Sequence, residues 1–231
     1  MTMTTAEAAD TRIMAIVHNS LKRDLRRVRA ALTGDPAPAG RQRRALGEHV
    51  EWLMDFLHDH HTAEDEGLWP LVRERNPAIG DLLDSLEADH QRIAPAIGPL
   101  VVAAREYART TGDEQRRALL SALDNLSELL LPHLDREVDE AMPLVSASIT
   151  KAEWEEWDQT KNIKPKSMPY LGIVGHWLLD DIDAEGRDVV VHQVPPVPRF
   201  VLVHGFAGIY RRQARKRWLP EPRRAPIRGG S

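Results

Sequence analysis

Four stretches of this sequence repeat apolar residues at alternating spacings of three and four, which places them along one face of an α-helix. The first runs from residue 14 to residue 32, and three comparable stretches follow between residues 41 and 144. Turn-forming residues separate them, namely Pro36 and Pro38, then Asn76-Pro77, then Gly112. Four amphipathic helices with short connections pack most simply as an up-down-up-down antiparallel bundle. We therefore predict an all-α four-helix bundle over residues 1–150.

A histidine interrupts each of the four apolar faces, and on two helices a glutamate follows four residues later. The histidines are His18, His60, His90 and His133, and the glutamates are Glu64 and Glu137. Residues four apart share a helix face, so each His-x-x-x-Glu pair can contact one metal ion, or two adjacent ions, from one side. One histidine on an apolar face is usually an ordinary core residue. Six such residues together predict a metal site, because burying two unpartnered carboxylates costs several kcal/mol each. A helical bundle without metal is the remaining alternative.

The chain has no cysteine, which excludes thiolate zinc sites, iron–sulfur clusters, disulfides and cysteine nucleophiles. Imidazole and carboxylate ligands without sulfur suit iron, manganese or zinc. Ferritin-like di-iron bundles use a pair of Glu-x-x-His motifs. Only Glu87-x-x-His90 fits that pattern here, so the ferritin-like layout is disfavoured.

The stretch His60-His61-Thr-Ala-Glu64, with His133-Leu-Asp-Arg-Glu137 and the single histidines of the other two helices, resembles the hemerythrin-like (HHE cation-binding) family over residues 11–148. The resemblance implies two non-haem iron ions, bridged by oxo or hydroxo groups and by carboxylates. It assigns terminal iron ligation to His18, His60, His90 and His133, and the bridging role to Glu64 and Glu137. His61 also has a good spacing on the helix face, so it is either a fifth imidazole ligand or a residue that supports a ligand.

The sequence departs from the oxygen-carrying members of that family at two places. Their third helix supplies two histidines four residues apart, but Leu86 and Ala94 flank His90 at that spacing. Their last helix supplies an aspartate five residues after its histidine, where this chain has Val138, and Glu137 takes the role. The ligand set is closer to that of the iron-sensing hemerythrin-like domain of a ubiquitin ligase subunit. These departures argue against reversible oxygen carriage.

Residues 151–231 show no chemical motif and form, in our interpretation, a mostly helical extension that packs on the bundle and ends in a basic, disordered tail. From residue 199 onward there are nine Arg or Lys and one Glu, in a chain whose formal net charge is −4. The apolar run 200–210 with the basic cluster after it indicates either a core helix with a solvated end, which we favour, or a peripheral contact with a membrane or a protein. No element that would read nucleic acid is evident. His49, His58 and four acidic residues near the two glutamates are expected at the surface, the acidic residues being Asp65, Glu66, Asp139 and Glu140.

We expect a di-iron protein that binds, senses or turns over a small ligand such as oxygen, nitric oxide or hydrogen peroxide. The alternative is an iron-binding or iron-sensing regulatory module without catalytic turnover. The N-terminus lacks the pattern of a secretory signal, and no apolar run is long enough to span a bilayer, which indicates a cytoplasmic protein.

Overall fold

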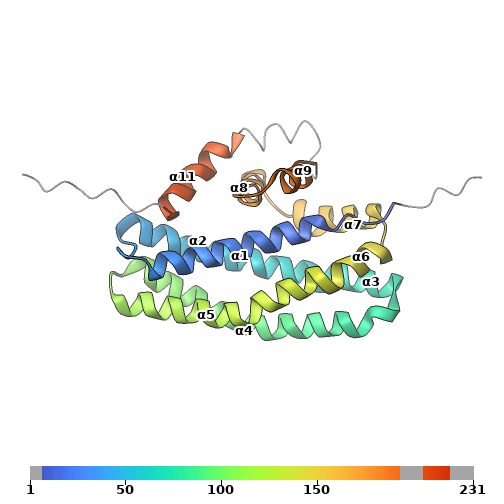
Figure 1. Ribbon diagram of the computed structural model, residues 1–231, viewed down its shortest axis with the longest axis horizontal. Helices are drawn as coiled ribbons and strands as arrows, with labels where there is room; N and C mark the ends of the chain where they lie inside the picture. Colours follow the sequence, from blue (N-terminus) through green and yellow to red (C-terminus); the bar gives the residue numbers. More distant parts are fainter. Residues whose placement is uncertain (1–6, 193–204, 219–231) are drawn as a thin grey trace, which may run out of the picture.

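The computed structural model describes residues 7–192 and 205–218, and this part of the chain contains helices and no β-strand. Four long helices lie side by side along the long axis of the molecule (Figure 1). They are α1 (Arg12–Thr33), α2 (Gly40–Ala63), α4 (Gly80–Arg109) and α5 (Asp113–Arg136). Each packs on two others, α1 on α2, α2 on α4, α4 on α5 and α5 on α1. The predicted all-α helical bundle is confirmed.

Hydrogen bonds between helix ends show how neighbouring helices run. Near the start of α5, Arg116 donates to the carbonyl of Leu32 at the end of α1, at 2.9 Å. Near the start of α2, Arg43 donates to the carbonyl of Tyr107 at the end of α4, at 2.6 Å. In both pairs the beginning of one helix lies beside the end of the other, so these neighbours are antiparallel. Pro95, Pro99 and Pro132, where we expected kinks, lie within α4 and α5, which continue through them.

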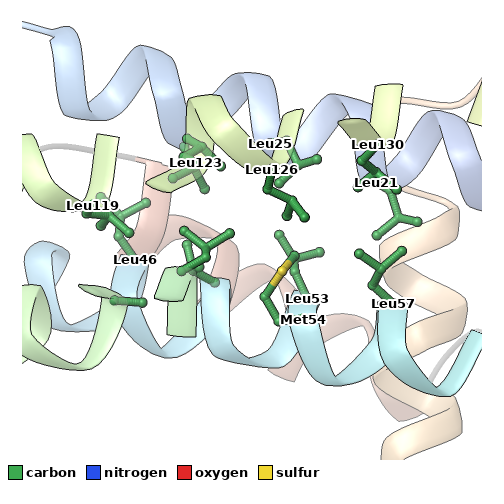
Figure 2. Close-up of a cluster of buried hydrophobic side chains, with 14 of the residues drawn as sticks. Leu21, Leu25, Leu46, Leu53, Met54, Leu57, Leu119, Leu123, Leu126 and Leu130 are labelled. Atoms are coloured by element: carbon green, nitrogen blue, oxygen red, sulfur yellow. The ribbon is translucent and has the colours of Figure 1, made fainter. Parts of the chain in front are cut away.

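Leucines from α1, α2 and α5 point toward one another and form the main core (Figure 2). Leu21, Leu25, Leu57 and Leu126 are among them, and each is at most 2% exposed. Burying each such side chain contributes about 1.5–3 kcal/mol. A second apolar cluster, which includes Trp69, Leu83 and Val145, closes the other end of the bundle. Between these two clusters each of the four helices carries the polar residues identified from the sequence.

Two of the long helices are widened by a π-helical segment that begins at a glutamate. The segment η1 (Glu64–Leu68) joins α2 to α3 (Trp69–Arg75), and η3 (Glu137–Ala141) joins α5 to α6 (Met142–Ser148). In each, the residue after the segment donates its backbone N–H five residues back, to the carbonyl of Glu64 or of Glu137. A proline follows at once, Pro70 or Pro143, and it lacks an N–H and would clash with the carbonyl four residues earlier in a regular helix. The wider turn accommodates the proline, and the helix continues.

The C-terminal helices pack on α1 and α2 (Figure 1). They are α7 (Lys151–Asp158), the π segment η4 (Gln159–Ile163), α8 (Met168–Leu178), α9 (Ala184–His192) and α11 (Ala207–Trp218), and a 3₁₀ turn, η2 (Pro77–Ile79), precedes α4. Trp154 and Trp177 are buried against the bundle. In α11 four basic residues are exposed, but Arg217 faces inward and is 8% exposed. The tail predicted to be disordered, residues 219–231, and residues 200–204 of the apolar run lie outside the described residues. Within the described part, no helix is long and apolar enough to cross a membrane.

Candidate metal centre

The structure brings together all seven residues that the sequence singled out as metal ligands. They come from four helices and the two π segments: His18 from α1, His60 and His61 from α2, Glu64 from η1, His90 from α4, His133 from α5 and Glu137 from η3. Each side chain is buried, with at most 8% of the residue exposed. The group lies between the two apolar clusters, so its polar atoms are shielded from water on both sides along the bundle axis.

Two groups of histidines face each other across this centre. In the first, Nε2 of His18 lies 3.0 Å from Nε2 of His60. In the second, Nε2 of His90 lies 3.1 Å from Nε2 of His133. His61 belongs to the second group: its ring stacks on that of His90 with centroids 4.0 Å apart, and a nitrogen of each of these three rings lies within 4.8 Å of the others.

Glu64 and Glu137 lie between the two histidine groups. Glu64 approaches Nε2 of His60 at 3.2 Å with one oxygen and Nε2 of His90 at 3.7 Å with the other. Glu137 Oε2 lies 3.8 Å from Nε2 of His18 and 3.5 Å from Nε2 of His133. None of the four carboxylate oxygens has a hydrogen-bond partner, although both residues are fully buried. Each carboxylate is therefore placed to reach a cation in either group.

Burial controls the protonation of this centre. It raises the pKa of Glu64 well above its usual range, helped by the charge of Glu137, and it raises the pKa of Glu137 to about 8. Burial, together with neighbouring imidazoles, lowers the pKa of His60 to about 3 and keeps those of His18 and His61 well below the usual value. These three imidazoles are consequently neutral and offer lone pairs, while burial disfavours the ionised form of the two carboxyl groups.

The sequence profile of the hemerythrin HHE cation binding domain matches residues 10–145. The chain belongs to this family. No curated protein and no solved structure matches the chain. The matched range contains all seven residues of the centre. Their buried nitrogen and oxygen donors, among them four carboxylate oxygens without a hydrogen-bond partner, fit the cation binding that names the family.

Two histidines of this hemerythrin-like centre are oriented by hydrogen bonds from Nδ1, the ring nitrogen that faces away from the centre. Nδ1–H of His18 donates to the carbonyl of Leu134 at 3.0 Å, and Nδ1–H of His90 donates to the carboxylate of Asp65 at 2.7 Å. Because both acceptors lack a proton to donate, the hydrogen must sit on Nδ1, and Nε2 is left free to face the centre. Asp65 was expected at the surface, and its side chain is 36% exposed, but its hydrogen bond to His90 was not predicted.

Asp89 is the other neighbour of the centre that the sequence analysis missed. It is 6% exposed, and its Oδ2 lies 3.6 Å from Nδ1 of His133, beyond hydrogen-bond distance. Arg136 donates to the same oxygen at 3.0 Å. Asp65 directly follows a ligand candidate and Asp89 directly precedes one, but their partners lie 25 and 44 residues away, so only the packing reveals these contacts.

His49 is buried, at 2% exposed, and the expectation that it lies at the surface is wrong. Its Nε2–H donates to Asp24 at 2.7 Å, and its Nδ1 accepts from Arg217 of α11 at 2.9 Å. It therefore belongs to the contact between the bundle and α11. His58, Glu66, Asp139 and Glu140 are exposed, as expected.

Proposed function

We propose that the centre holds two non-haem iron ions and that the protein binds, senses or turns over a small ligand such as oxygen, nitric oxide or hydrogen peroxide. His18 and His60 would hold one ion, and His61, His90 and His133 the other. Glu64 and Glu137 would contact both. The observation that carries the proposal is the pair of fully buried carboxylates, without hydrogen-bond partners, between two groups of buried imidazoles.

Two divalent cations would remove the energetic problem that this arrangement creates. A buried carboxylate without a partner costs several kcal/mol, and a protonated one leaves its oxygens unsatisfied. Cations between the imidazoles would allow both glutamates to ionise and would use all of the orphaned oxygens. His61 Nε2 is likewise buried without a hydrogen-bond partner, which favours His61 as a fifth imidazole ligand.

When bound, iron would supply the redox chemistry and open coordination positions for the small ligand. The protein groups would prepare the site for it. The hydrogen bond to Asp65 fixes the ring of His90 and increases the electron density on its Nε2. The apolar clusters on both sides limit the access of water, as Leu57 and Leu68, each 0% exposed, illustrate.

The test is to measure metal content and the ultraviolet–visible spectrum of protein from iron-supplemented cells, before and after addition of oxygen, nitric oxide or peroxide. We expect about two irons per chain, from the two ligand groups, and a spectrum that responds to at least one ligand. His61→Ala should lose part of the iron. His58→Ala, an exposed histidine on the same helix, is the matched control and should retain it. Folded protein that takes up no iron would overturn the proposal.

One contact favours a regulatory module as the second candidate. Trp157 of α7 donates its Nε1–H to the carbonyl of Ala63, the residue before Glu64, at 2.9 Å. A Cβ added at Gly67, inside the π segment, would lie 2.8 Å from the ring of the same tryptophan. The C-terminal helices thus contact the segment that presents a ligand, so iron occupancy could be transmitted to them. If chelation changes neither the melting temperature nor the amide hydrogen exchange of α7, this candidate fails.

A further inference from the structure

A cavity of about 450 Å³ lies between the bundle and the C-terminal helices. The bundle side of its wall comes from α1 and α2, with Ile13, Val17 and Phe56. The opposite side comes from α7, η4, α8 and α9, with Leu171, Val174 and other apolar residues. This volume lies in the range of small-molecule binding sites, roughly 300–1,000 Å³, and the predominance of apolar lining is typical of them.

The cavity reaches the candidate metal centre at His60. This histidine is part of the cavity wall and is 8% exposed, the largest value among the seven residues of the centre. The ring of Phe56, one turn earlier on α2, stacks beside it with centroids 6.2 Å apart and planes 19° apart. A molecule in the cavity would therefore touch the imidazole whose Nε2 faces His18 and Glu64.

Each of the three acidic or lysine side chains in the cavity wall has a polar partner in the protein. Lys166 is paired with Asp59, so neither offers a free charge to a ligand. Asp158 accepts a hydrogen bond from Asn162 at 3.1 Å, and burial raises the pKa of its carboxyl. These groups suit a hydroxyl or carbonyl group better than an anion or a cation.

The wall has unfilled space at a small residue. Gly175 of α8 lines the cavity, and a Cβ added there would meet no atom within 4 Å. Gly172, one turn earlier on the same helix, differs: its added Cβ would lie 2.4 Å from the ring of Phe206. Thus α8 is tightly packed at Gly172 and open at Gly175.

We propose that this cavity is a binding site for an uncharged, mainly apolar small organic molecule with a hydroxyl or carbonyl group, held between the bundle and the C-terminal helices against His60. The proposal assigns a role to the C-terminal helices that the family membership does not provide. Binding needs no metal, so this part stands apart from the proposed di-iron function. The position of the molecule next to the iron rests on that function.

The first test titrates full-length, metal-free protein with 2-naphthol, followed by calorimetry and by quenching of the tryptophan fluorescence, because Trp154 and Trp157 line the cavity. We expect saturable binding to one site. The anion 2-naphthoate, of nearly the same size, should bind at least about tenfold more weakly. Absence of saturable 2-naphthol binding, or equal binding of the anion, would overturn the proposal.

Two glycine variants locate the site. Gly175→Leu adds a side chain whose Cβ meets no atom within 4 Å, and it should weaken 2-naphthol binding about tenfold or more by occupying the open space. Gly98→Leu is the matched control, since a Cβ there also meets nothing within 4 Å and Gly98 is exposed on α4, away from the cavity. If both variants bind like the unmodified protein, the molecule binds elsewhere and the proposal is wrong.

A second measurement uses protein shown to contain iron. The iron is first reduced to the diferrous state, in which it is paramagnetic. Proton relaxation of bound 2-naphthol should then be enhanced and should return to the metal-free value after chelation. A failure to load iron would concern the di-iron proposal and leave the calorimetric result untouched. Binding to iron-loaded protein without relaxation enhancement would refute the placement against His60.

Discussion

This protein buries carboxylates beside histidines in two places, and the two places differ in what satisfies them. In the contact between the bundle and the C-terminal helices, Asp24 accepts hydrogen bonds from His49, from Trp177 Nε1 at 3.0 Å and from Arg23 Nε at 2.8 Å. In the metal centre, the oxygens of Glu64 and Glu137 accept none. All three carboxylates are 0% exposed, so burial alone does not distinguish the two places.

The electrostatic consequences are opposite. Burial by itself would raise the pKa of Asp24, but the hydrogen bonds from His49 and Arg23, with the charge of Arg23, outweigh burial and lower it to about 2. Burial dominates at Glu137 and raises its pKa to about 8. Protein groups alone satisfy the carboxylate of Asp24, whereas the oxygens of Glu64 and Glu137 have no hydrogen-bond partner. Whether buried carboxylate oxygens accept hydrogen bonds therefore distinguishes a structural network from a binding site more clearly than residue type does.

The largest expected effect is the loss of metal from a variant that remains folded. Glu64→Gln keeps the size of the side chain but removes the anion between the two histidine groups, so we expect most of the iron to be lost. In the metal-free state the variant should be as stable as the parent within about 1 kcal/mol, because no hydrogen bond is broken. Metal analysis and urea unfolding of the metal-free forms check both points. A variant that unfolds would show that Glu64 is a structural residue.

A substitution at Asp24 should have the opposite effect: it should lower the stability of the protein and leave its iron content unchanged. Asp24→Ala leaves His49, Trp177 and Arg23 without their acceptor, and we expect a loss of about 3–5 kcal/mol in the free energy of unfolding. Iron content at low temperature should stay unchanged. Asp55→Ala, an exposed aspartate of α2, is the control. A loss below about 1 kcal/mol would contradict the view that this network is structural.

The same contrast shows what the sequence could predict. The helix-face spacing of the apolar residues was sufficient to predict the bundle. The spacing of His60 with Glu64 and of His133 with Glu137 indicated that these residues gather in its interior, because spacing along one helix fixes which residues share a face. The Asp24–His49 pair was missed because its members belong to different helices. No local pattern distinguishes a buried histidine such as His49 from the exposed His58.

The π segments and the outer partner of His90 could not be predicted with equal ease. Pro70 and Pro143 are each the second residue after a π segment, but Pro95, Pro99 and Pro132 lie in helices that remain α-helical, so a proline alone does not predict a π segment. At the first π segment the preceding residue, Ala63, also accepts a hydrogen bond from Trp157 of α7. Such tertiary contacts lie outside any single-helix pattern.

The pH dependence of stability should differ between the metal-free and metal-loaded protein. A carboxyl group with a raised pKa stays protonated when folded and ionises when unfolded, so its contribution to stability is lost as pH rises toward the folded pKa, about 8 for Glu137. His60 and His133 have lowered pKa values, about 3 and about 4. Their contribution to the free energy of unfolding therefore changes with pH only below about 6.5. Between pH 6.5 and 8 the carboxyls therefore dominate.

In that range we expect metal-free protein to lose roughly 1.4 kcal/mol per pH unit for each carboxyl that stays protonated. Urea unfolding at several pH values measures the slope, and Glu137→Gln should reduce it by one group. Iron-loaded protein, in which the glutamates are ionised in the folded state, should lack this loss. A slope that is the same with and without iron would contradict the assigned protonation.

The smallest expected effect concerns Asp65. Its contact with His90 resembles the contact of Asp24 with His49. Here too an aspartate accepts a hydrogen bond from a histidine, at 2.7 Å, but its side chain is 36% exposed. Asp65→Asn retains an acceptor and removes the charge that makes His90 a better ligand. We expect iron affinity to fall about tenfold, the lower end of the effect of such outer partners, with little change in metal-free stability.

Asp139→Asn removes the same charge from an exposed position on the other π segment and is the matched control. If both variants bind iron equally weakly, general electrostatic attraction explains the effect and Asp65 has no specific role. If only Asp65→Asn is weakened, the hydrogen bond to His90 acts on the metal through the imidazole. An aspartate–histidine pair would then serve iron binding in the metal centre, whereas Asp24 and His49 serve the packing of the C-terminal helices on the bundle.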